Sequence, residues 1–220
     1  MKKNYHLLKR TSDIVISLIT IIIFLPVFIL IHLSILISSG KPALYKSKRI
    51  GKNKKIFTAY KFRTLVNNAK ELQKTKGYRM NPPDERLITP IGKFLRATHL
   101  DELPQLFNIL KGDISFIGPR PLDIDFYKRY IKKNKHWSRI LKIKPGLTGL
   151  NQICRYHPQH MHKILRKCGK LNNLKKRRRL LLDLHYLKNE SLYIDMLVVY
   201  WTIRLFFTRI FQIFILFKLN

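Results

Sequence analysis

A long uncharged stretch dominates the N-terminal part of the chain. From Ile14 to Ile37 the sequence IVISLITIIIFLPVFILIHLSILI contains no Asp, Glu, Lys or Arg. A helix of this length is sufficient to cross a hydrocarbon layer of roughly 30 Å. The stretch is too long for the apolar part of a cleaved signal peptide, and no convincing small-residue cleavage site follows it. We therefore predict that this segment enters a membrane.

The flanks of this stretch favour a re-entrant topology. Basic residues precede it in MKKNYHLLKR and follow it in KPALYKSKRIGKNKK, whereas a spanning helix carries them mainly on its cytoplasmic side. Pro26 lies near the middle, where it removes an amide donor and bends a helix. We expect the segment to turn back at Pro26 to the face from which it entered. The alternative is a single kinked helix that spans the membrane.

The pattern after Pro42 changes to short elements. Residues 43–51 and 55–65 mix β-branched and aromatic residues with basic ones, which predicts two strands joined by a hairpin around Gly51 to Lys55. Residues 64–77 follow a helical pattern that stops at Gly77. Helical spacing returns from Lys93 to Leu110, interrupted at Pro104 and ended by Gly112. A turn, a basic helix and a second turn follow.

The C-terminal stretch is apolar but charged. Residues 191–220 are rich in Leu, Ile, Phe, Tyr and Trp and also contain Arg204 and Arg209, which argue against a second clean span. We expect a helix in the membrane interface with arginines reaching headgroups. The alternative is a helix packed on the globular core. The predicted division is a membrane segment at 1–40, a globular domain at 41–200 and an interfacial helix at 201–220.

The charge of the chain calls for an anionic partner. Lys and Arg number 44 against 12 Asp and Glu, giving a formal net charge of +32. Nucleic acid, anionic lipid and phosphorylated substrates all suit such a surplus, so charge alone does not choose among them. The two cysteines are too few for a disulfide scaffold and are most simply free thiols in a reducing compartment.

Two adjacent pairs stand out among the few carboxylates. Asp84-Glu85 precedes Arg86 in a proline-rich loop, which predicts a solvated local ion pair. Asp101-Glu102 lies between leucines and ahead of the turn GPRP, which contains Arg120. Thr98 three residues before Asp101 also fits a capping box, a structural alternative that leaves Glu102 unexplained. The residues favour a phosphate-handling site over a capped surface helix.

The chain resembles the bacterial sugar transferase family, the monotopic phosphoglycosyl transferases. The resemblance covers most of the chain and is carried by KRTSD (Lys9 to Asp13) with Pro26, RIG (Arg49 to Gly51), KFRT (Lys61 to Thr64), the block from Asp84 to Pro121, KPGLTGLNQI (Lys144 to Ile153) and Asp183, Tyr186, Ser191 and Asp195. The sequence departs from the family pattern at Ser47, Leu25 and Leu150.

The resemblance implies a fold and a reaction. The fold is mostly α with small β elements: an N-terminal re-entrant membrane helix hairpin and a compact cytoplasmic α/β catalytic domain with interfacial helices. The reaction moves a sugar 1-phosphate from a UDP-sugar to undecaprenyl or another polyprenol phosphate, at the cytoplasmic face of the bacterial inner membrane. The implied cofactor is Mg²⁺, membrane lipids are expected partners, and no nucleic acid is expected.

The family's catalytic Asp-Glu pair corresponds to Asp101 and Glu102. The resemblance implies that Asp101 is the nucleophile and that both carboxylates lie near or on the magnesium ion. The cations expected around the substrate phosphates are Lys61, Arg63, Arg96 and Arg120, of which Arg63 and Arg96 could instead hold the fold or touch lipid headgroups.

Two further features have simpler interpretations. Residues 154–168 contain two cysteines and three histidines, but their spacing fits no standard zinc module and the neighbouring basic residues would repel a cation. The tract KKRRR is better explained by anionic lipid than by nucleic acid. The alternative function, from another class, is a non-catalytic basic membrane protein that binds lipid or nucleic acid.

Overall fold

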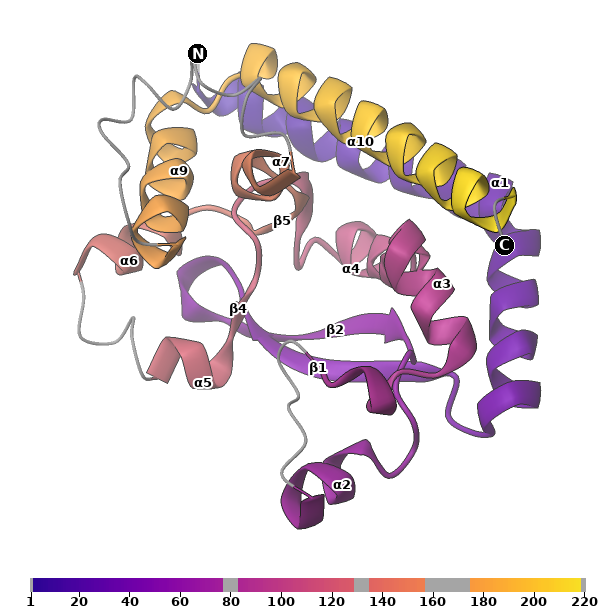
Figure 1. The fold of residues 1–220 in the computed structure, drawn as a ribbon. Helices are drawn as coiled ribbons and strands as arrows, with labels where there is room; N and C mark the ends of the chain where they lie inside the picture. The colour runs from indigo at the N-terminus through magenta and orange to yellow at the C-terminus, as the bar shows by residue number, and fades with distance from the viewer. Residues whose placement is uncertain (1, 77–82, 129–134, 157–174, 219–220) are drawn as a thin grey trace.

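The computed structural model describes residues 2–76, 83–128, 135–156 and 175–218 (Figure 1). The helices are α1 (Lys2–Ser39), α2 (Ala69–Lys76), α3 (Pro90–Thr98), α4 (Gln105–Lys111), α5 (Ile124–Phe126), α6 (Lys135–Ile140), α7 (Leu150–Tyr156), α9 (Lys175–Asn189) and α10 (Leu192–Lys218). The strands are β1 (Leu44–Ile50), β2 (Ile56–Phe62), β3 (Ser115–Ile117), β4 (Leu122–Asp123) and β5 (Gly146–Thr148). Short 3₁₀ turns are η1 (Lys52–Lys54), η2 (Glu85–Leu87) and η3 (Leu100–Glu102). The expectation of a mostly helical fold with small sheets is confirmed.

The N-terminal apolar stretch forms one bent helix. α1 is 38 residues long with Pro26 inside it, and Figure 1 shows its two limbs meeting at an open angle. Proline removes one backbone hydrogen bond and bends a helix without unwinding the turns on either side. The limbs do not lie side by side, so the hairpin that we expected is not confirmed. Within the described residues, α1 is the one helix long and apolar enough to cross a membrane.

The first two strands form the predicted hairpin. β1 pairs antiparallel with β2 along its whole length, from Leu44 opposite Phe62 to Ile50 opposite Ile56. β4 adds to the other edge of β1, so β2 is an edge strand. Asn108 of α4 covers that edge, because its side chain accepts a hydrogen bond from the Tyr60 amide and donates one to the Thr58 carbonyl. This contact fixes α4 beside β2.

The segment that contains Asp101 and Glu102 breaks earlier than expected. Helical spacing predicted one helix interrupted at Pro104, but α3 ends at Thr98 because His99 is left-handed, with φ of 60°. The Thr98 hydroxyl donates to the Phe94 carbonyl, so the capping-box alternative is wrong. Gly112, with φ of 82°, ends α4 as predicted.

Polar residues of α1 dock its first limb onto the globular part. Lys9 donates to Asp195 of α10 at 2.5 Å. Arg10 donates to the carbonyls of Ile109 and Leu110 at 2.6 and 2.7 Å, at the end of α4. Asp13 is buried and accepts hydrogen bonds from Ser115 and Phe116 of β3. Each contact satisfies a polar group that a purely lipid-exposed helix would leave unpaired.

The C-terminal helix has one packed and one exposed side. Asp195 and Val198 are buried, and α10 contacts α7, α3 and β3, which confirms packing on the core. An apolar stripe on the other side remains exposed, comprising Tyr193, Met196, Tyr200, Ile203, Phe207 and Phe211. The helix begins at Leu192, at the start of the apolar stretch of residues 191–220.

A close backbone approach positions the turn that follows β3. β3 pairs parallel with β5, and a Cβ added to Gly146 would lie 2.0 Å from the Gly118 amide nitrogen. We expect Gly146→Ala to lower the free energy of unfolding by about 2 kcal/mol or more, because backbone has to move. Gly51→Ala is the matched control, since its Cβ would meet a Phe57 ring atom at 3.2 Å that can shift. Thermal unfolding in detergent micelles measures both; equal melting temperatures for the two variants would contradict the prediction.

Candidate active site

Three separate segments bring charged side chains to one place. Lys61 comes from the end of β2, Asp101 and Glu102 from η3, and Arg120 from the GPRP turn between β3 and β4. The left-handed residue His99 ends α3, and the 3₁₀ turn that follows it carries both carboxylates. Three of these four residues are joined by ion pairs, and the fourth lies in their field.

Glu102 is held as an anion. Its Oε1 accepts hydrogen bonds from Lys61 Nζ at 2.5 Å and from Arg120 Nη2 at 2.6 Å. Burial favours the neutral acid, but the charges of Arg120 and Lys61 outweigh it and hold the pKa of Glu102 well below its usual range. Both bonds go to one oxygen, so in the described part of the chain Oε2 has no hydrogen-bond partner.

Asp101 is buried in a different electrostatic environment. Only 9% of the residue is exposed, and no group in the described ranges donates a hydrogen bond to its carboxylate. Burial raises its pKa to about 6, with a further contribution from Glu102, while Lys61, Arg96 and Arg120 act in the opposite direction. The adjacent carboxylates therefore differ: Glu102 is bound by cations, and Asp101 keeps its oxygens available in a cationic surrounding.

Arg96 and Arg63, the two arginines with alternative roles, lie in different places. Arg96 donates to the Thr64 hydroxyl at 2.7 Å. Burial lowers the pKa of Arg96, while the charge of Asp101 acts in the opposite direction. Arg63 donates to Asn67 and to the carbonyls of Ser39 and Gly40 at the end of α1. Arg63 thus ties α1 to β2, and its role as a phosphate ligand stays a prediction.

A second ion pair, between Arg179 and Asp183, supports the backbone of Arg120. Arg179 of α9 donates to the Arg120 backbone carbonyl at 2.9 Å and lies 3.6 Å from the carboxylate of Asp183, which is 3% exposed. Its guanidinium also lies over the rings of Phe126 and Trp137. The sequence marked Asp183 as part of the family pattern but gave no role to Arg179, because its partners are distant in sequence.

The other predicted features have clear outcomes where the chain is described. Asp84 binds Arg86 through two side-chain hydrogen bonds at 2.9 Å, so the predicted local ion pair is confirmed. Cys154 is buried. The histidines and the second cysteine of the 154–168 segment lie outside the described residues.

The carboxylate pair fits a magnesium ion bound together with substrate phosphates. Mg²⁺ is commonly held by one or two carboxylates plus phosphate oxygens and water. The Asp101 carboxylate and Glu102 Oε2 have no hydrogen-bond partners among the described residues, which leaves acceptor oxygens for such an ion. Within the described ranges no group of three or more His, Cys, Asp or Glu gathers as a self-sufficient metal site. Substrate phosphates would have to complete the coordination.

The fold and the site together define a protein with a long apolar N-terminal helix and a carboxylate pair whose surrounding cations suit a phosphorylated substrate. The family model for bacterial sugar transferases matches residues 4–209. The chain belongs to the bacterial sugar transferase family.

Curated relatives support the assignment. The chain is 36% identical to an uncharacterized sugar transferase of Haemophilus influenzae and 34% identical to the undecaprenyl-phosphate galactose phosphotransferase of Salmonella typhimurium. Each match covers 94% of this chain and 42% of the relative. An exopolysaccharide production protein of Sinorhizobium fredii is 32% identical over 89% of this chain and 83% of its own length. The chain thus spans about two fifths of the length of the first two relatives.

Neutralising the two carboxylates is predicted to shift stability in opposite directions. The folded pKa of Asp101 lies above the ordinary value of 3.8, so ionisation of Asp101 destabilises the fold as pH rises from about 4 through 6. We expect metal-free Asp101→Asn to gain up to about 3 kcal/mol over wild type at pH 7.5, a gain that disappears near pH 4. Glu102→Gln should instead lose stability, because Lys61 and Arg120 lose their partner. Chemical denaturation with a chelator at both pH values tests this; shifts of the same sign would contradict it.

Proposed function

We propose that this protein transfers a sugar 1-phosphate from a UDP-sugar to undecaprenyl phosphate, as the first membrane step of polysaccharide or glycoconjugate synthesis. The observation that carries the proposal is the pairing of an available buried carboxylate, Asp101, with an ionised neighbour held by Lys61 and Arg120. Family membership and the name of the Salmonella relative, which specifies undecaprenyl phosphate, support it.

The proposed reaction has two displacements at one phosphorus atom. An Asp101 carboxylate oxygen bonds to the sugar-bearing phosphorus of the UDP-sugar, and the bond from that phosphorus to the bridging oxygen breaks to release UMP. A phosphate oxygen of the lipid then bonds to the same phosphorus and frees Asp101. A carboxylate needs no deprotonation above its pKa of about 6, so it suits this role at neutral pH.

The cations of the site supply the electrostatic part of the reaction. Phosphoryl transfer depends mainly on positioning and on neutralising charge on the phosphate oxygens. Lys61 and Arg120 are fixed by Glu102, and Arg96 lies within the field of Asp101. We assign Asp101 and Glu102 as magnesium ligands; the bound ion would neutralise diphosphate charge and stabilise departing UMP.

The donor sugar is not assigned. Relatives are named for galactose in Salmonella typhimurium, for glucose in Klebsiella pneumoniae and for N-acetylgalactosamine in Aeromonas hydrophila. A panel of these three UDP-sugars therefore forms the starting set for an assay.

The proposed topology places both ends of α1 and the globular domain on the cytoplasmic face of the inner membrane. Basic flanks on both sides and the bend in α1 support this arrangement. We expect single cysteines near Lys3 and Lys52, in a background without native cysteines, to resist an impermeant thiol reagent in intact cells and to react after lysis. Labelling of the Lys3 site alone in intact cells would show a spanning helix.

The reaction is tested by UMP release from purified protein with the UDP-sugar panel, undecaprenyl phosphate and Mg²⁺. We expect release with at least one sugar, complete loss of turnover in Asp101→Asn, and about a hundredfold loss in Lys61→Met. Asp84→Asn is the control, because it removes a carboxylate of the other acidic pair, which binds Arg86. No release with any sugar, together with salt-sensitive nucleic-acid binding, would favour the non-catalytic alternative. Full turnover by Asp101→Asn would exclude Asp101 as the nucleophile.

A further inference from the structure

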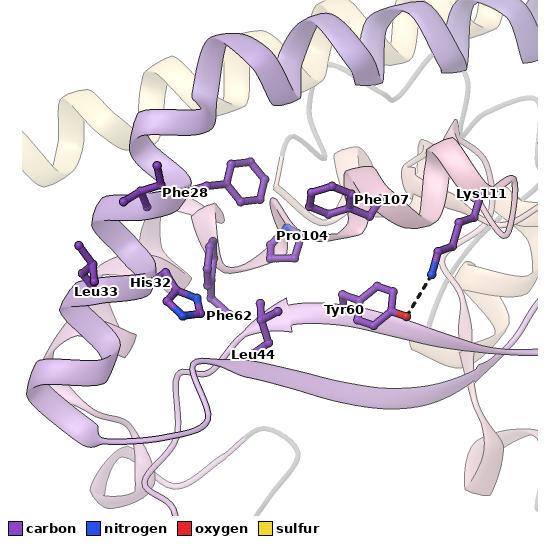
Figure 2. A pocket seen from close by; sticks show the side chains of 10 residues that line it. Phe28, His32, Leu33, Leu44, Tyr60, Phe62, Pro104, Phe107 and Lys111 are labelled. Carbon is purple, nitrogen blue, oxygen red and sulfur yellow. Dashed lines mark hydrogen bonds between the residues drawn. The ribbon is translucent and has the colours of Figure 1, made fainter.

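An apolar groove lies between the second limb of α1, the β1–β2 hairpin and α4. Figure 2 shows it from close by, and its volume is about 480 Å³. Three phenylalanines form its centre: the ring of Phe28 lies 5.7 Å from that of Phe62 and 6.0 Å from that of Phe107, between centroids. The complete lining is Phe28, Ile29, His32, Leu33, Leu44, Tyr60, Phe62, Pro104, Phe107 and Lys111.

One wall of the groove belongs to the apolar helix itself. Ile29 and Leu33 line the groove and are 52% and 49% exposed, so the groove opens along α1. Leu30 and Ile37 of the same limb do not line the groove and are also exposed, at 64% and 86%. Apolar side chains in such numbers are unfavourable against water. An apolar chain could therefore pass from lipid beside α1 into the groove without crossing water.

The opposite wall belongs to the segments that carry the catalytic candidates. Pro104 follows Glu102 by two residues, and Phe62 follows Lys61, the residue that binds Glu102. Lys111, the last residue of α4, gives the groove a positive charge at that end. Its Nζ lies 3.2 Å from the Tyr60 hydroxyl and 5.0 Å from the centroid of the Tyr60 ring. None of the ten lining residues is acidic. The groove thus suits an amphiphile with an apolar chain and an anionic headgroup.

We propose that this groove binds the isoprenoid chain of the acceptor lipid phosphate, an inference that rests on the proposed function. The apolar lining, the opening along α1 and the position of the groove beside the segments that contain Lys61 and Glu102 commit it to the acceptor rather than to the soluble nucleotide sugar. Isoprene units of the acceptor chain fill this groove, and a long chain fills more of it than the short farnesyl chain does. The groove therefore selects for chain length, and the headgroup chemistry belongs to the charged site.

The test compares two tryptophan substitutions on one helix limb. Leu33→Trp fills the groove, whereas Leu30→Trp adds the same side chain to an exposed position outside its lining. Acceptors are undecaprenyl phosphate and farnesyl phosphate, assayed at a fixed mole fraction in detergent micelles. We expect Leu33→Trp to lower kcat/KM for the long acceptor about tenfold or more, to lower it much less for the short acceptor, and Leu30→Trp to match wild type. A burst of UMP without acceptor shows that the donor site of each variant is folded.

Several outcomes would contradict the binding of the acceptor chain in the groove while leaving the proposed reaction intact. Identical acceptor kinetics for Leu33→Trp and Leu30→Trp would show that the chain binds elsewhere, and so would equal losses for the two acceptors. A photoreactive isoprenoid phosphate provides an independent arm that needs no turnover. We expect it to label the peptide containing Pro104 and Phe107, with competition by undecaprenyl phosphate but not by phosphatidylglycerol. Equal competition would assign the groove to bilayer lipid. If the wild-type protein releases no UMP, the result counts against the proposed reaction. The photolabelling experiment still shows whether the groove binds an isoprenoid chain.

Discussion

The ion pairs of Glu102 with Lys61 and Arg120 constrain the rest of the site. A partly buried carboxylate with two bound cations is stable as an anion, whereas loss of one partner leaves a charge without compensation. The two cations come from segments far apart in the sequence, so β2 and the GPRP turn must both be in place before the site exists. The close approach of Gly146 to Gly118 and the hydrogen bond from Arg179 to the Arg120 carbonyl hold that turn. Asp101 remains beside this arrangement with its oxygens available.

The long apolar helix α1 is tied to the same elements. Lys9, Arg10 and Asp13 attach its first limb to α10, to the end of α4 and to β3. Arg63 attaches the end of its second limb to the exit of β2. The helix is therefore fixed through its first limb to β3, which leads into the turn with Arg120, and through its second limb to the end of β2, which carries Lys61. Such attachment keeps the site at a constant position relative to α1, which a flexible linker would not do.

Local sequence patterns predicted what depends on neighbouring residues. The β1–β2 hairpin and the stop at Gly112 follow from short-range preferences, and charge statistics isolated Asp101-Glu102. The capping-box alternative at Thr98 was wrong because the Thr98 hydroxyl donates its hydrogen bond within α3. The left-handed conformation of His99 has no strong signal in the sequence. The pair Lys9–Asp195 spans 186 positions, so no local pattern could reveal it. The family resemblance marked both residues without explaining their contact.

The central claim is that Glu102 binds the side chains of Lys61 and Arg120, whereas Asp101 is the nucleophile that forms the covalent bond to the sugar phosphate. Mass spectrometry of protein incubated with its UDP-sugar and Mg²⁺, without acceptor lipid, tests this most directly. The expected result is one sugar phosphate per protein on the peptide containing Asp101, lost on addition of undecaprenyl phosphate and absent from Asp101→Asn. An adduct on Glu102 or on another peptide, or lipid product formed by wild type without any adduct under single-turnover conditions, would contradict the account.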